Sequence, residues 1–116
     1  MNQRDLMFKR NESARLLEFT SRGHRNCVRF NTTNGVKHEM KKAEVCYYLK
    51  LAGIEYCTEA EFVGKESRAD IMVLDDNCAI EIIDSESPES IELKRKKYPC
   101  QIMTLNVNEQ FKGVKI

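Results

Sequence analysis

The sequence predicts a single α/β domain in which a central mixed β-sheet of about four or five strands is flanked by helices. Its 116 residues are enough for one hydrophobic core. Hydrophobic residues make up 41% and charged residues 32%, which is typical of a globular protein and argues against disorder. Short apolar runs of strand character alternate with segments of helical periodicity. We therefore expect one domain over residues 1–116, with an N-terminal extension at 1–35 and a core at 36–107.

The N-terminal extension predicts a helix followed by a strand. Residues 10–20 carry apolar side chains at helical spacing, with Asn11 or Ser13 as the N-terminal cap. Residues 27–32 alternate apolar and polar side chains, which is typical of a strand, and the dipeptide at 34–35 is Asn-Gly, a strong turn signal.

The core predicts two helices and four strands. The first helix is expected at 36–52, where no glycine or proline interrupts the chain and Gly53 follows as the C-terminal cap. The second is expected to begin at Pro88 and to end before Pro99. The strands are rich in β-branched and aromatic residues. The expected order is a helix at 36–52, strands at 54–62, 69–74 and 78–83, a helix at 88–98 and a strand at 101–107.

Composition excludes several classes of protein. No apolar run approaches the roughly 18–20 residues of a membrane span, and the first residues lack the apolar stretch of a signal peptide. We expect a cytoplasmic protein without a membrane partner. The five cysteines are odd in number and form no CxxC pair, so we expect buried free thiols rather than a zinc cluster or disulfides.

The net charge of +1 gives the whole chain little attraction for phosphate backbones. Two local groups of basic residues stand out, Lys37, Lys41 and Lys42 in the first core helix and Lys94 to Lys97 in the second. Each group is either a solvated helix face or a surface that meets phosphates.

Two acids lie inside the most apolar strands, Asp70 between Ala69 and Ile71 and Glu81 between Ile80 and Ile82. A carboxylate in such a strand needs a cation or hydrogen bonds, because burying an unpaired charge is costly. A two-residue turn at 76–77 would place Met72 opposite Glu81 and make Asp70 its diagonal neighbour on the same face. Two converging carboxylates are suited to Mg²⁺ or Mn²⁺. A shift of one residue would separate them.

The segments at 68–74 and 79–83, with a helix before them and a helix and strand after them, resemble the PD-(D/E)XK nuclease superfamily. That superfamily includes restriction enzymes, RecB-type nucleases and archaeal Holliday-junction resolvases. The resemblance covers about residues 36–107 and implies a restriction-endonuclease-like core. It also implies that Asp70 and Glu81 hold a metal and that an acid from the first helix completes the site. Glu44 is the counterpart we expect, with Glu39 as the alternative. His38 resembles the helix histidine of RecB-type members, although a lone exposed histidine also fits.

The chain departs from this pattern two residues after Glu81, where the superfamily has a catalytic lysine and this sequence has Ile83. Lys94, on the following helix, is the candidate substitute. Together with Tyr98 it resembles the QxxxY element of RecB-type nucleases, with lysine in place of glutamine; a basic exposed helix with a core tyrosine is the alternative. The acids at 84–86 are either surface residues or replacements for missing parts of the site.

Three interpretations follow from the sequence. The first is a magnesium-dependent endonuclease that hydrolyses DNA, including branched or structured DNA, with Glu44, Asp70, Glu81 and Lys94 as catalytic residues. The second is a catalytically inactive nuclease-fold module that binds nucleic acid or a protein partner. The third is an unrelated α/β domain in which Asp70 and Glu81 pair with a basic residue such as Arg68. A homodimer is compatible with the first two, and the N-terminal thirty residues either supply its contact or cover a sheet edge.

Overall fold

The computed structural model describes residues 1–64 and 66–114. The described chain forms four helices and four strands, in the order α1 (Gln3–Ala14), α2 (Phe19–Arg22), α3 (Val36–Leu51), β1 (Tyr56–Glu61), β2 (Arg68–Val73), β3 (Cys78–Ile83), α4 (Pro88–Lys97) and β4 (Gln101–Asn106).

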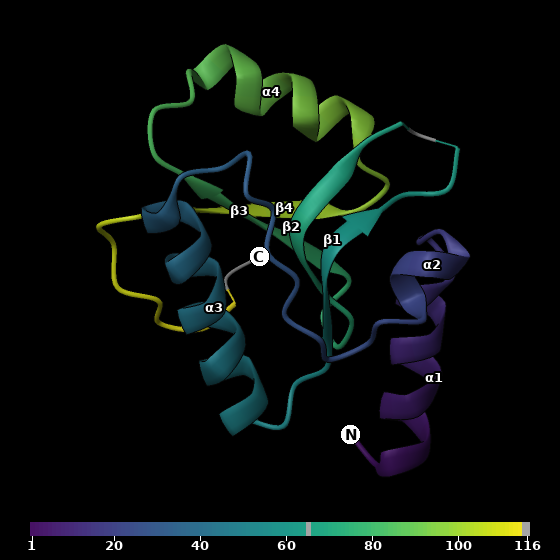
Figure 1. The fold of residues 1–116 in the computed structure, drawn as a ribbon. Helices are drawn as coiled ribbons and strands as arrows, with labels where there is room; N and C mark the ends of the chain where they lie inside the picture. The colour runs from purple at the N-terminus through teal and green to yellow at the C-terminus, as the bar shows by residue number, and fades with distance from the viewer. Residues whose placement is uncertain (65, 115–116) are drawn as a thin grey trace.

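The four strands form one open mixed sheet in the order β1-β2-β3-β4. The β1–β2 and β2–β3 pairs are antiparallel, and β3 and β4 are parallel because α4 carries the chain back across the sheet. Helices α3 and α4 lie on opposite sides of this sheet (Figure 1). The predicted α/β class with a mixed sheet flanked by helices is therefore confirmed, with four strands.

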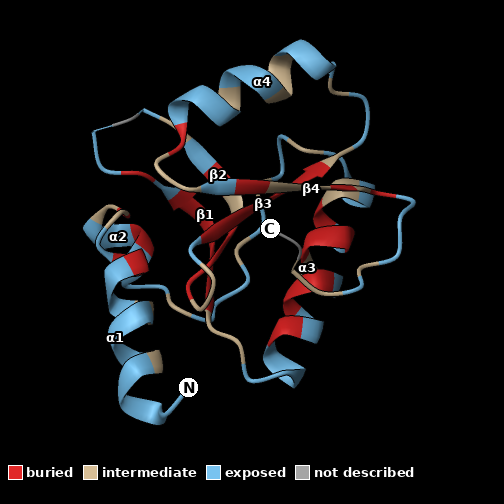
Figure 2. Ribbon diagram, turned by 180° about the vertical axis from the view of Figure 1, so that it is seen from behind, coloured by how far each residue is buried: buried red, intermediate tan, exposed pale blue. Residues whose placement is uncertain are grey.

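Each face of the sheet has its own apolar core. Val45, Cys46 and Leu49 of α3 pack on the face that carries Ile80 and other apolar strand residues. The opposite face packs against Tyr98, directly after α4, and against the end of α1. Figure 2 shows the difference between the helices, since α3 has one buried face and α4 is exposed or half-buried along its whole length. Helix α4 is therefore attached mainly through its ends and its long polar side chains.

The N-terminal extension differs from its prediction. Helix α1 begins at Gln3, where the Asn2 side chain accepts a hydrogen bond from the Asp5 N–H at 2.8 Å, and it ends at Ala14. Residues 27–31 form no strand. The capping asparagine at position 2 precedes the apolar pattern used to place the helix at 10–20, which is why the prediction began too late.

This extension covers the outer edge of β1, as one of the two predicted alternatives requires. Leu17 forms an isolated antiparallel bridge with Phe62. The Asn26 N–H donates to the Tyr56 carbonyl at 2.6 Å. Further along, the Thr58 hydroxyl donates to the Cys27 carbonyl at 2.7 Å and accepts from the Arg29 N–H at 2.8 Å. The backbone groups of this edge thus find partners within the chain, which protects the edge from pairing with another molecule.

The β2–β3 hairpin has a different register from the predicted one. Met72 pairs with Ala79 and Val73 with Cys78, so the connection comprises residues 74–77 rather than a two-residue turn. The ladder stops early because the Leu74 N–H donates to the Glu55 carbonyl and the Asp75 carboxylate accepts from Arg10 and from the Glu55 N–H. The shift is two residues, so the residues paired from Ile71 to Val73 keep their predicted faces.

All five cysteines are free, and three of them, Cys46, Cys57 and Cys78, are buried as expected, whereas Cys27 is exposed. Burial raises the pKa of the Cys46 thiol to about 12, which is unsuitable for a nucleophile. None of the described helices has the length and apolar character that a bilayer crossing requires.

The covered edge gives a first testable prediction. Leu17→Ala should lower the free energy of unfolding by about 2–5 kcal/mol, because Leu17 is fully buried against Phe62 and neighbouring core residues. Chemical denaturation followed by circular dichroism measures it. Leu51→Ala is the matched control, since Leu51 is 71% exposed, and should change the free energy by less than about 0.5 kcal/mol. Equal stability of the two variants would mean that the extension is not part of the folded unit.

Candidate active site

The strands β2 and β3 separate where the two predicted acids lie. Their last backbone pair is Ile71 with Ile80, and beyond it Asp70 and Glu81 stand opposite each other. The Asp70 N–H donates to Glu81 Oε2 at 2.8 Å, and the Ile82 N–H donates to Asp70 Oδ2 at 2.8 Å. Each carboxylate thus accepts an N–H from the opposite strand, in place of a backbone carbonyl. The two acids are adjacent, but as direct opposites rather than as the predicted diagonal neighbours on one face: Asp70 contacts His38 of α3, and Glu81 contacts Lys94 of α4.

A local irregularity accompanies this opening. Ala69 and Met72 pack in the same core cluster although they are three residues apart, so the alternation of β2 breaks at Asp70. Strand β1 breaks at the matching place, since Cys57 and Ala60 also share that cluster and Glu59 between them has φ of 48°. Such a conformation is uncommon for a residue other than glycine. The paired irregularities direct Asp70 and Glu59 away from their regular strand positions.

Glu81 is buried on the α4 side of the sheet, and two groups bind one of its oxygens. The Tyr98 hydroxyl donates to Oε1 at 2.8 Å, and Lys94 Nζ lies 3.0 Å from the same oxygen. Burial, together with the negative charge of Asp70, raises the pKa of Glu81 to about 7 in spite of these partners. Lys94 also reaches Glu86 Oε2 at 2.8 Å. Although burial opposes it, contact with Glu86 and Glu81 raises the pKa of Lys94, which is therefore a cation at neutral pH.

Asp70 meets a different cation, from the α3 side. His38 Nε2 lies 3.3 Å from Asp70 Oδ2, and His38 Nδ1 lies 2.7 Å from Glu39 Oε2. The hydrogen bond to Asp70, helped by Glu39, raises the pKa of His38 to about 9. Burial would raise the pKa of Glu39, but hydrogen bonds from Lys42 and other donors lower it to about 2. At neutral pH the imidazole is thus an imidazolium held between two carboxylates.

A buried lysine of α3 links Glu39 to a further acid, Glu59 of β1. Lys42 is fully buried, with Nζ 2.6 Å from Glu39 Oε1 and 3.2 Å from Glu59 Oε2. Lys41 is also buried, at 8% exposure. Both alternatives offered for this lysine group, a solvated face or a phosphate-binding surface, are therefore wrong for Lys42, which balances two buried acids.

The other predicted site residues lie in different places. Glu44, the expected third acid, is on the exposed face of α3, 3.0 Å from Lys41 and away from Asp70 and Glu81, because the buried positions of the helix include Lys42, Val45 and Leu49. Ile83 is half-buried at the end of β3. Arg68, named as a partner for the two acids, instead lies 3.9 Å from both Glu59 and Glu61. The cations beside Asp70 and Glu81 are His38 and Lys94.

The ion pair between Lys42 and Glu59 was not predicted from the sequence. Glu39 and Lys42 are three residues apart, a spacing that brings side chains together on a helix, and this signal was available. Glu59 lies within a predicted strand, and nothing in the local pattern indicates its positive φ. The link between helix and strand is a long-range contact that the spacing of residues does not reveal.

The donor set suits a divalent cation in its chemistry. Mg²⁺ is commonly held by one or two carboxylates, with water and phosphate oxygens completing its shell. Asp70 and Glu81 supply two such groups, and Asp70 Oδ1 accepts no hydrogen bond from the described residues. Residues 1–64 and 66–114 contain no cluster of three or more potential metal ligands. A metal here would therefore depend on water and substrate for most of its ligands.

Comparisons with known proteins add no relatives: no protein-family model, no curated protein and no solved structure matches this chain.

The buried lysine gives a prediction about stability. Lys42→Met should destabilise the fold by about 3–5 kcal/mol, because it leaves the Glu39 and Glu59 carboxylates buried without their shared cation. Urea denaturation at neutral pH measures the change. Lys50→Met in the last turn of the same helix removes an exposed lysine and should cost less than about 0.5 kcal/mol. A Lys42→Met protein as stable as wild type would contradict the role assigned to this pair.

His38 gives a prediction about pH. In metal-free buffer the imidazole should titrate near pH 9 by NMR, well above its ordinary 6.5. Because the folded protein binds this proton more tightly, the stabilising contribution is fully present below pH 6.5 and is lost as pH rises through 9. Unfolding free energy should therefore fall over that interval, and this part of the fall should disappear in His38→Gln. His24→Gln is the control for the second, exposed histidine, and a profile equally altered by both variants would contradict the prediction.

Proposed function

We propose that this protein is a metal-dependent nuclease that hydrolyses DNA phosphodiester bonds. The observation that carries the proposal is the meeting of the Asp70 and Glu81 carboxylates in the opening between β2 and β3, with a lysine ammonium 3.0 Å from one of them. The order of helix, three strands, helix and strand supports a restriction-endonuclease-like core, which is part of the same proposal.

Asp70 and Glu81 would hold Mg²⁺ or Mn²⁺. Such an ion would supply an activated water and stabilise charge at the phosphate. Glu81 must lose its proton to act as a ligand, and with its pKa raised to about 7 its ionised fraction increases through the neutral range. Metal affinity should therefore rise with pH around neutrality.

The third acid of the site is better supported as Glu39 than as Glu44. Glu39 is buried and reaches Asp70 through the His38 imidazolium, whereas Glu44 faces solvent beside Lys41. Glu39 would orient His38 and hold its positive charge next to Asp70. In this arrangement Glu39 acts as a positioning residue and does not need to touch the substrate.

The superfamily pattern has a lysine at the position of Ile83, and Lys94 of α4 is the candidate substitute for it. Its ammonium bridges Glu81 and Glu86, and its side chain is 30% exposed. Release of Glu81 to a metal would free this cation to face the charge that develops on a phosphate. The Tyr98 hydroxyl keeps Glu81 in place during that exchange, since it donates to Glu81 Oε1.

A second candidate function is a catalytically inactive module of the same fold that binds nucleic acid or a protein partner. The specific observation in its favour is that both carboxylates already contact a protein cation, Asp70 through His38 and Glu81 through Lys94. A site neutralised in this way is stable without a metal. A homodimer, which would give so small a domain more surface for a duplex, remains compatible with either function.

The nuclease proposal predicts loss of cleavage in two conservative variants. Wild-type protein should nick or cut supercoiled, linear or branched DNA in Mg²⁺ or Mn²⁺. Asp70→Asn and Glu81→Gln should each abolish that activity, because each removes an ionised ligand. Glu44→Gln is the matched control on an exposed acid and should cleave as wild type does. DNA binding without cleavage in any divalent metal would support the inactive module instead.

The same assay separates the roles of the lysines. Lys94→Ala should lower turnover at least tenfold while metal binding, measured by calorimetry, persists. Lys97→Ala removes a lysine from the same exposed run and should leave turnover unchanged. If Lys94→Ala also turned over normally, this lysine would have no part in the mechanism.

A further inference from the structure

A hollow of about 450 Å³ lies beside the candidate active site, between the loop that leads into α3 and the strands β1 and β2. Arg29, Phe30 and Thr32 line it from the loop, and Glu59 and Arg68 from the strands. Arg68 is two residues before Asp70 on the same strand, which corresponds to about 7 Å of extended chain.

The charge in this hollow is positive. Arg29 forms no ion pair with any described acidic side chain; its guanidinium is held by the carbonyls of Thr58 and Glu59 at 2.8 and 3.1 Å. Its Nε atom is buried and has no hydrogen-bond partner within residues 1–64 and 66–114. Glu59, the acid of the hollow, is balanced by Lys42 at 3.2 Å. Two arginines therefore line a space with one carboxylate, Glu59, which contacts both Lys42 and Arg68.

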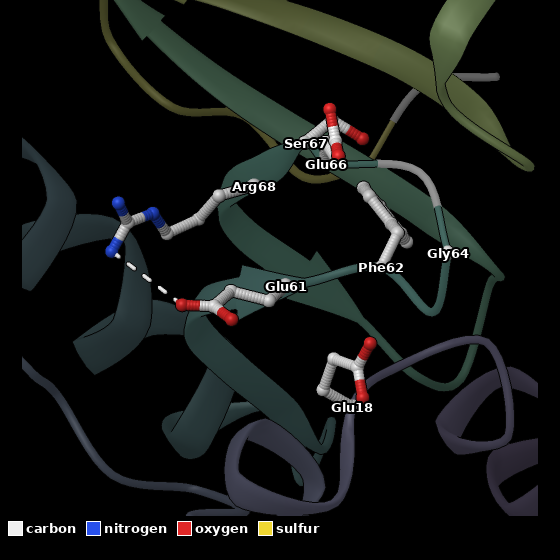
Figure 3. Close-up of a pocket in the computed structure, with 7 residues that line it drawn as sticks. All are labelled: Glu18, Glu61, Phe62, Gly64, Glu66, Ser67 and Arg68. Carbon is white, nitrogen blue, oxygen red and sulfur yellow. Dashed lines mark ion pairs between the residues drawn. The ribbon is translucent and has the colours of Figure 1, made fainter.

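Within the described residues, Arg68 is held only by two long ion pairs and can exchange them for a ligand. Its two contacts with glutamates, at 3.9 Å, are too long for hydrogen bonds, and its side chain is 50% exposed. Figure 3 shows its guanidinium directed away from Glu66 and joined to Glu61 by the dashed line of their ion pair. A neighbouring hollow is lined by Glu18, Glu61 and Glu66 and would repel a phosphate. The Arg29 side is the one that can accept an anion.

The hollow lined by Arg29 also contains an aromatic ring. Phe30 lines the hollow and is 58% exposed, so its ring is accessible from that space. Exposed aromatic rings beside a positive groove are typical of surfaces that bind single-stranded nucleic acid, because every unpaired base can stack on them. The Thr32 hydroxyl, also exposed, adds a hydrogen-bond donor for a phosphate oxygen.

We propose that this hollow binds an unpaired segment of the nucleic-acid strand next to the bond at Asp70, with a phosphate on Arg29 and Arg68 and a base on Phe30. The inference deepens the proposed function and rests on it for the identity of the strand that crosses Asp70. It implies a substrate with a single-stranded part, such as a flap, a gap or a branch point.

Binding measured without divalent metal tests the site independently of cleavage. Fluorescence anisotropy of a labelled oligothymidylate of about 12 nucleotides, in EDTA, gives the affinity and its dependence on salt. Arg68→Ala should weaken binding and lower the slope of log K against log salt by about 0.7, the effect of one lost phosphate contact on a single strand. Arg4→Ala, an exposed arginine on α1, should leave that slope unchanged. Equal slopes for the two variants would overturn the proposal.

Phe30→Ala tests the base. It should weaken binding of the single strand at least about fivefold and leave binding of a blunt duplex nearly unchanged. Phe19→Ala removes another exposed ring, 76% exposed, and should have no effect. All variants are at exposed positions and are checked for wild-type thermal unfolding. A matching oligouridylate distinguishes RNA from DNA as the source of the strand, and dependence on Arg68 and Phe30 in either supports the site.

The two proposals can fail separately. A wild-type protein that binds the oligonucleotide through Arg68 and Phe30 but cuts no DNA retains this site and loses the nuclease function. A protein that cuts DNA while Arg68→Ala and Phe30→Ala bind as wild type does retains the nuclease function and loses this site.

Discussion

The exchange of hydrogen bonds between Asp70 and Glu81 is the feature on which the rest of the site depends. Each carboxylate accepts a backbone N–H from the opposite strand, at 2.8 Å in both cases. The acids thereby replace carbonyl acceptors at the point where β2 and β3 separate, and the opening leaves no backbone donor unpaired there. Because the opening lies between the two faces of the sheet, α3 can approach one acid and α4 the other.

The charges around this opening are arranged as an alternating series. The series consists, in order, of Arg68, Glu59, Lys42, Glu39, His38 and Asp70. Each charged group lies within 3.9 Å of the next. Buried charges are tolerated when each has a partner, and removal of one member leaves its neighbours uncompensated. This explains how a domain with a net charge of +1 contains a fully buried lysine. It also connects the proposed strand-binding hollow to the acids by continuous contacts.

The core elements could be predicted because local signals determined them. The proline at 88 and the glycine at 53 mark helix ends, and β3 was predicted with its observed bounds at 78–83. The hairpin signal placed Asp70 and Glu81 on neighbouring strands, and a two-residue error in register keeps the faces of the regularly paired residues. It did not predict the break of β2 at Asp70, which brings this acid to His38 of α3 while Glu81 meets Lys94 of α4. The start of the N-terminal helix had a local signal in Asn2, which the apolar pattern used for its placement did not include. The burial of Lys42 and the contact of His38 with Asp70 depend on long-range packing, about which the patterns that place elements contain no information. The exposed Glu44 was misplaced for the same reason: helical spacing gives the faces of a helix but not which one meets the sheet.

Whether this site can work as an enzyme depends on how readily its two protein cations exchange for a metal and a phosphate. His38 is held on both sides by carboxylates, and its contact with Asp70 engages one oxygen and leaves Oδ1 without a hydrogen bond from the described residues. Lys94 is on a flexible side chain at the surface of α4 and has a second acid, Glu86, at 2.8 Å to retain it when it leaves Glu81. Exchange at Glu81 therefore requires no change of fold and leaves no buried cation unpaired. The more exposed of the two cations, Lys94, thus contacts the acid whose pKa is raised to about 7. A cation that replaced it there would again favour the ionised form of Glu81.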